Sequence, residues 1–187
     1  MEQIFYHVVT ERPMELGQVI VFDKNNRSGV YNRVYELKDV VNEIYLNPSK
    51  YDEAKLDHHT KVALRELALE EVRRNDYPNY PSRLESLYVS KTIEEAQNWY
   101  NYFISLGRPT FQIVKVKVNG NSFTGDACNC FEGTVNKDDN IKLSKIYWSG
   151  KDNLLGQKPV YETIVSGKIE VIEIIKENDN LINNKNQ

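Results

Sequence analysis

Hydrophobic residues in the first part of the chain follow two different periods. Residues 4–9 and 16–22 are short runs dense in β-branched and aromatic residues, which predict two strands. Over residues 34–45, apolar residues recur at steps of three and four, which is typical of a helix. A second helix is predicted over about 51–74, because an apolar stripe runs along it opposite Glu and Arg. The pattern indicates a strand pair followed by a helical insertion over about 32–76.

Strand patterns dominate the rest of the chain. Leu87 to Ser90 is a short apolar run, and Thr92 followed by Glu95 is a capping box that predicts a helix ending at Leu106. Residues 125–140 are predicted to be a loop-like connection. The remaining strands are predicted at 111–118, 122–124, 158–165 and 168–175, with hairpin turns at Asn119-Gly120 and Ser166-Gly167.

These elements predict an α+β fold with a largely antiparallel sheet and a helical insertion after the first strand pair. At this length we expect a single domain over residues 1–176. The tail over residues 177–187 is polar and rich in Asn, which predicts disorder.

Charge and cysteine content narrow the class of protein. The 187 residues carry a formal net charge of −3, which gives no electrostatic reason to expect a nucleic acid or an anionic membrane as partner. No run of about 18 apolar residues occurs, and the acidic, soon polar N-terminus is unlike a signal peptide. Cys128 and Cys130 are too close for an ordinary disulfide framework, so a reducing cytoplasm is the expected compartment.

Metal chemistry has little support in the sequence. His58 and His59 are adjacent on a predicted helix, where neighbouring side chains point about 100° apart and do not share a metal-binding face. Cys128 and Cys130 lack the partners of a zinc or redox motif. We therefore expect no metal.

Two aromatic residues suggest a slot for a flat ligand. Tyr88 lies in a predicted strand, and Trp99 follows eleven residues later on the next predicted helix. Aromatic side chains in such places can clamp a flat ring, but they are more often part of the core.

Three polar residues lie at the ends of three predicted strands, in the order His7, Tyr88 and Glu162. The motifs are Phe5-Tyr6-His7, then Leu87-Tyr88-Val89-Ser90 with Ala96 and Trp99, then Val160-Tyr161-Glu162-Thr163. This order resembles the ADP-ribosyltransferase fold, in the group shared by diphtheria-type toxins, poly(ADP-ribose) polymerases and rifampin ADP-ribosyltransferases. The resemblance covers about residues 4–24 and 80–175 and implies a split antiparallel sheet.

The resemblance implies an enzyme that cleaves the nicotinamide–ribose bond of NAD and transfers ADP-ribose to a protein, nucleic-acid or small-molecule acceptor. NAD is then a substrate. The implied catalytic residues are Glu162, His7 and Tyr88. The implied NAD-binding residues are His7, Val8, Arg12, Arg83, Tyr88, Ser90, Trp99 and Trp148.

Each implied residue has a chemical role. The Glu162 carboxylate would stabilise positive charge on the reacting ribose, and His7 would bond a ribose hydroxyl. Tyr88 would stack on the nicotinamide while Trp99 closes the other side. The planar guanidinium group of Arg83 or Arg12 would reach the pyrophosphate, and Trp148 would line the pocket or an acceptor groove.

Two positions depart from the resembling family. Val8 stands where the family usually has Gly, which makes the backbone approach to nicotinamide tighter. Val160 stands where the arginine-modifying branch has a second Glu, so arginine is not the favoured acceptor.

The chain as a whole also resembles DUF2441, an uncharacterised bacterial family of similar size, in Pro81-Ser82-Arg83 and Tyr147-Trp148. Two other hypotheses stay open. The protein could hold NAD, ADP-ribose or a modified nucleotide without turnover, or it could be an interaction protein whose charged helix over 51–74 is the partner surface. Each site residue also has an alternative as a surface charge, a backbone-bonded histidine or a core aromatic.

Overall fold

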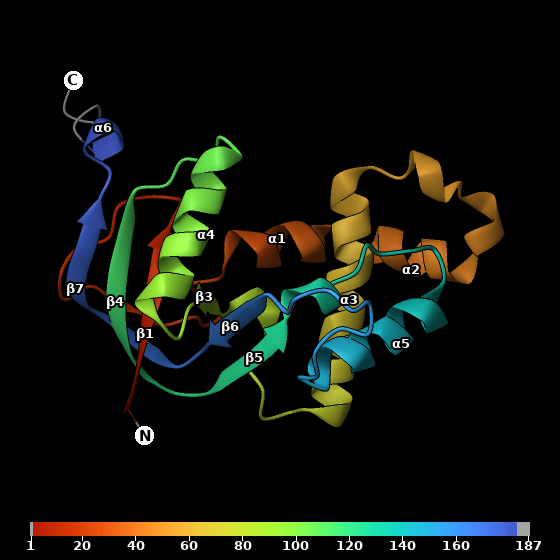
Figure 1. Cartoon of the computed structure of the whole chain (residues 1–187). Coiled ribbons are helices and arrows are strands. Elements are labelled where there is room, and N and C mark those ends of the chain that lie inside the picture. The colour runs from red at the N-terminus through yellow and green to blue at the C-terminus, as the bar shows by residue number, and fades with distance from the viewer. Residues whose placement is uncertain (1, 183–187) are drawn as a thin grey trace. The chain divides into compact units, whose positions relative to one another are not determined.

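The computed structural model describes residues 2–182, which form two compact units (Figure 1). Unit 1 comprises residues 2–21, 87–122 and 163–182, and unit 2 comprises residues 22–86 and 123–162. The chain therefore passes between the two units several times within the stretch that the sequence predicted to be one domain.

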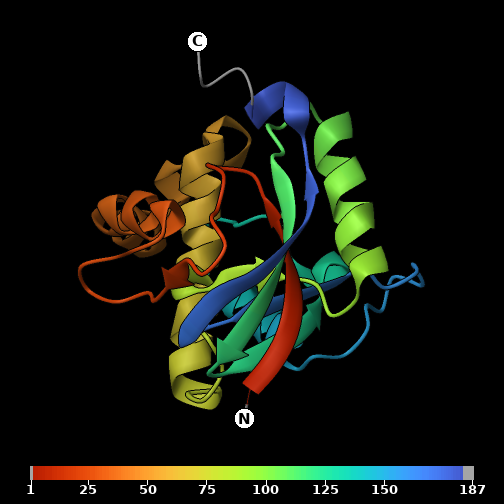
Figure 2. The same cartoon turned by 90° about the vertical axis from the view of Figure 1, so that its left-hand side faces the viewer.

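Unit 1 is built on a four-stranded antiparallel sheet in the order β1-β4-β7-β2. Its strands are β1 (Glu2–Val9), β4 (Gln112–Asn119), β7 (Lys168–Glu177) and β2 (Val19–Ile20). The sheet is curled, as Figure 2 shows. The predicted α+β class with an antiparallel sheet is confirmed, although the second predicted strand is only two residues long.

Helix α4 (Ile93–Ser105) covers one face of this sheet (Figure 2). It begins where predicted, because the Thr92 hydroxyl accepts a hydrogen bond from the backbone N–H of Glu95 at 3.2 Å. Its buried residues Ala96 and Tyr100 pack against Val8 and Ile113 of the sheet. This apolar contact fixes which face of β1 is covered.

A second, three-stranded sheet has the order β3-β6-β5, with β3 (Leu87–Val89), β6 (Tyr161–Val165) and β5 (Ser122–Asp126). Strand β6 pairs antiparallel with β3, with Tyr88 opposite Ile164. The predicted hairpins at Asn119-Gly120 and Ser166-Gly167 are wrong, because β4 does not pair with β5, nor β6 with β7. The chain instead changes sheet at each of these positions, and the two glycines allow the two corners to approach closely.

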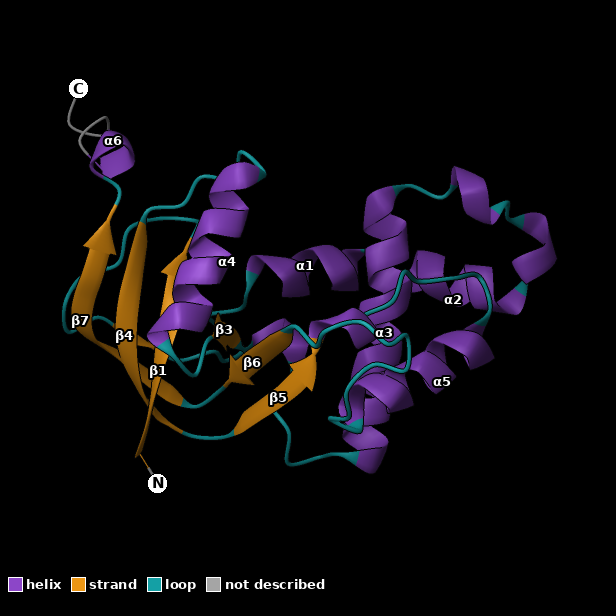
Figure 3. Cartoon of the chain, in the orientation of Figure 1, coloured by secondary structure: helices purple, strands orange, loops and turns teal. Residues whose placement is uncertain are grey.

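Unit 2 is mostly helical (Figure 3). Its helices are α1 (Gly29–Glu36), α2 (Lys38–Leu46), α3 (His58–Asp76) and α5 (Lys137–Trp148). Short 3₁₀ turns lie at Pro48–Lys50, Glu53–Lys55, Arg83–Glu85 and Ala127–Asn129. The predicted helix over 51–74 begins only at His58, because Asp57 caps it by accepting from the N–H of Thr60 at 3.0 Å.

Helix α5 differs from the prediction, which placed a loop-like connection over residues 125–140 and no helix after it. Its buried face carries two polar residues, Asn140 and Ser144, ahead of Tyr147 and Trp148, so the apolar spacing of an amphipathic helix is absent. The buried side-chain amide of Asn140 has a hydrogen-bond partner, because it donates to Tyr45 Oη at 2.8 Å. The capping residue Asn136, followed by two acidic residues in the first turn, is the signal that could have located the helix.

The polar tail begins with the last residue of β7. Residues Asp179–Ile182 form a short helix, α6, and residues 183–187 of the predicted tail lie outside the described residues. Over residues 2–182, no helix combines the length and apolar character needed to cross a membrane.

The corner at Gly167 generates a prediction about stability. Its φ is +99°, and an added Cβ would lie 2.4 Å from the Asn119 carbonyl oxygen. Gly107 also has a positive φ, +71°, but an added Cβ there meets nothing within 4 Å. We expect Gly167→Ala to lower the free energy of unfolding by about 3 kcal/mol or more, and Gly107→Ala by about 1 kcal/mol. Urea denaturation measures both, and equal losses would contradict the close approach.

Candidate functional site

The centre of unit 2 holds a buried guanidinium, that of Arg83. The Ser82 hydroxyl caps the 3₁₀ turn that carries it, by accepting from the backbone N–H of Leu84 at 3.2 Å. Ser82 is itself anchored to α3, because its hydroxyl donates to Glu70 Oε2 at 2.9 Å. Only 7% of the Arg83 side chain is exposed, so its charge needs partners inside the protein.

Two carboxylates and a phenol surround Arg83. Its Nε donates to Glu66 Oε2 at 3.1 Å, and its Nη1 donates to Glu162 Oε1 at 2.5 Å. The same Nη1 lies 2.5 Å from Tyr147 Oη. The guanidinium carbon also lies 4.8 Å from the centre of the Tyr147 ring. The predicted site residues Arg83 and Glu162 therefore form an ion pair.

Glu162 is held through one of its two oxygens. Oε1 accepts from Arg83 and from the Tyr147 hydroxyl, the latter at 2.7 Å. Among the described residues, no hydrogen bond is made to Oε2. The side chain is 15% exposed, so the carboxylate keeps some access to solvent. This leaves Oε2 as an acceptor for a ligand hydroxyl.

Glu66 is the other carboxylate beside Arg83, and it is 3% exposed. Burial raises its pKa, but the charges and hydrogen bonds of Arg83 and Arg65 outweigh that effect and hold the pKa below its usual value. Arg65 Nε donates to Glu66 Oε1 at 3.0 Å. Glu66 is therefore ionised at neutral pH.

Glu66 is not among the predicted site residues, because the charged side chains of α3 were expected to lie opposite its apolar stripe. A signal was present, however. Glu66 lies three residues from both Ala63 and Leu69, which places it within the buried stripe of the helix.

Cys130 lies at the edge of this cluster. Its Sγ is 3.9 Å from Arg83 Nη2. Burial raises the pKa of the thiol despite the nearby charges of Arg83 and Arg65. The thiol is therefore protonated at neutral pH, which argues against a nucleophilic role.

Unit 1 brings three other predicted residues together. The His7 Nδ1 lies 2.7 Å from the backbone oxygen of Tyr88, and Ser90 exchanges backbone hydrogen bonds with Tyr6 at 2.7 and 2.9 Å. Because a carbonyl oxygen only accepts, Nδ1 must carry the proton. The Nε2 of His7 is then the acceptor of the ring.

His7 is half-buried by surface area, yet its ring is surrounded densely enough to disfavour the charged form. Desolvation lowers its pKa from the usual 6.5 to about 4; the bond to Tyr88 acts in the opposite direction, and Arg108 adds to the lowering. The imidazole is therefore neutral at pH 7.

Trp99 of α4 packs against one face of β1, and the His7 side chain lies on the other face. Trp99 packs with Tyr6 and Val8 in the cluster beneath α4. Side chains alternate along a strand, so His7 points away from the face that carries Tyr6 and Val8. Trp99 is therefore a packing residue on the far face of β1 from His7.

The remaining predicted residues differ in exposure. Tyr88 is 38% exposed, which leaves part of its ring open to a ligand, and Arg12 is exposed. Val8 is buried beneath α4. Trp148 is fully buried in unit 2, where its Nε1 donates to the Leu69 carbonyl at 2.8 Å. It offers no ring face to a pocket or groove.

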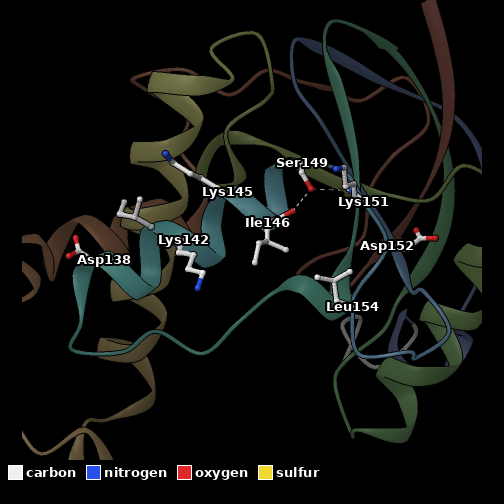
Figure 4. A pocket seen from close by; sticks show the side chains of 9 residues that line it. Asp138, Lys142, Lys145, Ile146, Ser149, Lys151, Asp152 and Leu154 are labelled. Carbon is white, nitrogen blue, oxygen red and sulfur yellow. Dashed lines mark hydrogen bonds between the residues drawn. The ribbon is translucent and has the colours of Figure 1, made fainter.

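A separate hollow of about 630 Å³ lies along α5 and the segment that follows it (Figure 4). Its lining is mainly apolar, with Ile146 and Leu154 facing each other near Lys142 and Lys151. None of the predicted site residues lines it. Within residues 2–182, no group of three or more His, Cys, Asp or Glu is arranged to hold a metal ion.

The low pKa of His7 predicts a pH dependence. A folded-state pKa of about 4 against 6.5 in the unfolded chain means that its contribution to stability is complete above pH 6.5 and is lost as the pH falls through about 4. In that window we expect this one proton to add a slope of up to about 1.4 kcal/mol per pH unit. His7→Gln should remove that part of the slope in urea titrations, and His59→Gln, at an exposed position, should keep it. Parallel curves for wild type and His7→Gln would contradict a desolvated, neutral His7 ring.

Comparison with known proteins identifies the family but not the activity. No curated protein matches the chain. A family model described as a protein of unknown function, DUF2441, matches residues 5–177, a stretch that contains every predicted site residue. The predicted resemblance to this family is therefore confirmed, and the chain belongs to the DUF2441 family.

Proposed function

We propose that the protein is an NAD-dependent ADP-ribosyltransferase in which Glu162 supplies the carboxylate beside the reacting ribose. One observation carries the proposal: Glu162 Oε1 is fixed by Arg83 and Tyr147, while Oε2 makes no hydrogen bond to the described residues. The side chain lies at the edge of the solvent, where a ligand can reach it.

This arrangement suits cleavage of the nicotinamide–ribose bond. The C1′–N bond breaks, its electron pair leaves with nicotinamide, and positive charge builds on the ribose. A carboxylate beside that sugar stabilises the charge by its field and by a hydrogen bond to the 2′-hydroxyl that strengthens as the charge develops. A nucleophilic oxygen or nitrogen of the acceptor then bonds to C1′, and its proton passes to solvent water.

His7 and Tyr88 support the proposal from unit 1. The bond to the Tyr88 carbonyl fixes the His7 ring and leaves Nε2 to accept from a ribose hydroxyl, a positioning role. The neutral ring suits this role, because an imidazolium could not accept a hydrogen bond. The partly exposed ring of Tyr88 can stack on the nicotinamide.

The order of the motifs along the chain, with His7 first, Tyr88 second and Glu162 third, supports the proposal as well. The curled antiparallel sheet is compatible with an ADP-ribosyltransferase fold, which forms part of the proposal. The acceptor is a protein, a nucleic acid or a small molecule, and the two free cysteines suit the cytoplasm.

One observation favours a second function, a module that binds NAD or ADP-ribose without turnover. The charge of Arg83 lies against Glu162 and weakens the field that the carboxylate would exert on a ribose cation. The same hydrogen-bonding atoms would then hold a nucleotide in its ground state.

Glu162→Gln tests the proposal. The variant keeps the side chain's shape but removes its negative charge, so we expect NAD binding by calorimetry to persist within about threefold and nicotinamide release to fall about 100-fold or more. Glu173→Gln is the matched control, because Glu173 is a half-exposed strand residue paired with Lys115.

The outcomes separate the candidates. Unchanged nicotinamide release in Glu162→Gln would remove Glu162 from the chemistry. Binding without release in the wild-type protein would favour the non-catalytic module, and absence of any nicotinamide-nucleotide binding would overturn both functions.

A further inference from the structure

We infer that Arg83 and Tyr147 are positioning residues that orient Glu162, and that Arg83 does not bind the pyrophosphate of NAD. The inference rests on the proposed function. It reassigns Arg83 from the ligand-binding role that the resemblance implied.

The contacts of Arg83 are directed inward. Nε and Nη2 face Glu66 at 3.1 and 3.4 Å, and Nη1 is shared by Glu162 and Tyr147. The ionised Glu66 is held in turn by Arg65. A pyrophosphate would have to displace one of these carboxylates from a guanidinium that is 7% exposed, and a buried carboxylate left without its partner is strongly unfavourable.

Tyr147 is a donor in a fixed direction. Its hydroxyl has one proton, and the carboxylate of Glu162 can only accept, so that proton points to Oε1 while the oxygen accepts from Arg83. The Tyr147 ring is fully buried against Phe123 and Trp148, with centroids 5.5 and 5.0 Å apart. The hydroxyl is therefore held by the packing of unit 2.

Together the two donors hold Oε1 and determine the direction of Oε2. Losing either donor lets the carboxylate rotate about its terminal bond, so that the acceptor for the 2′-hydroxyl is no longer in place when charge develops. Such a loss acts on the transition state more than on NAD binding, which means that kcat falls and KM changes little.

Steady-state nicotinamide release by Tyr147→Phe and Arg83→Lys tests the inference. We expect kcat to fall about tenfold in Tyr147→Phe and at least as much in Arg83→Lys, with KM for NAD within about twofold of wild type. Tyr45→Phe is the matched control, since Tyr45 also donates a partly buried hydrogen bond in unit 2, to the Leu64 carbonyl at 3.0 Å, and the variant should keep both constants.

A second readout needs no turnover. With ¹³Cζ-labelled tyrosine, the NMR signal of Tyr147 should shift in Glu162→Gln and stay in place in Glu173→Gln, because only the first variant changes its hydrogen-bond acceptor. This shift reports the contact even if Arg83 variants fold poorly.

Three results would each overturn the inference while leaving the proposed function in place. The first is a KM for NAD raised at least tenfold in Arg83→Lys at unchanged kcat, because that change is the signature of a pyrophosphate ligand. The second is a normal kcat in both variants, and the third is an unshifted Tyr147 signal in Glu162→Gln. A wild-type protein that binds no NAD, or releases no nicotinamide, would instead overturn the proposed enzyme, and the positioning role with it.

Discussion

The buried guanidinium of Arg83 is the constraint on which unit 2 depends. A charge in the interior is tolerated only when it is paired and hydrogen-bonded, and here the partners come from segments far apart in the sequence: Glu66 on α3, Tyr147 on α5 and Glu162 at the start of β6. Removing one partner would leave the others as buried, incompletely paired groups. The same contacts that join these segments also hold Glu162 by Oε1, and among the described residues its Oε2 takes part in no hydrogen bond.

The half-buried imidazole of His7 in unit 1 is stabilised in a different way. His7 is neutral in the fold because desolvation outweighs the hydrogen bond to Tyr88, so this site carries no counter-ion and needs none. The ring is oriented by a backbone carbonyl, and its position is determined by the face of β1 that α4 leaves uncovered. The fixed acceptor of His7 is thus a property of unit 1 alone, as the fixed carboxylate of Glu162 is of unit 2.

Membership of the DUF2441 family leaves the activity to be argued from these side chains. A mixed α+β fold with a curled antiparallel sheet accommodates many functions, so the proposal depends on what Glu162 and His7 can do chemically. The structure also reduces the set of side chains that can touch a ligand. Trp148 is fully buried, Trp99 packs beneath α4, and Arg83 is paired with Glu162. Among the predicted site residues, this leaves Tyr88 as the aromatic side chain that is more than a third exposed.

The sequence by itself determined the elements whose signals are local: the strands of unit 1, the Thr92 cap of α4 and the long helix α3. Capping residues and apolar periodicity act over a few residues, so they can be interpreted without knowing the neighbours. It also singled out His7, Tyr88, Arg83 and Glu162. Only the tertiary structure decided that Asn119-Gly120 and Ser166-Gly167 are corners between sheets, that α5 buries polar residues, and that Glu66 joins Arg83 and Glu162. The reason is that strand partners, buried polar contacts and ion pairs form between residues distant in the chain, where no local pattern records them.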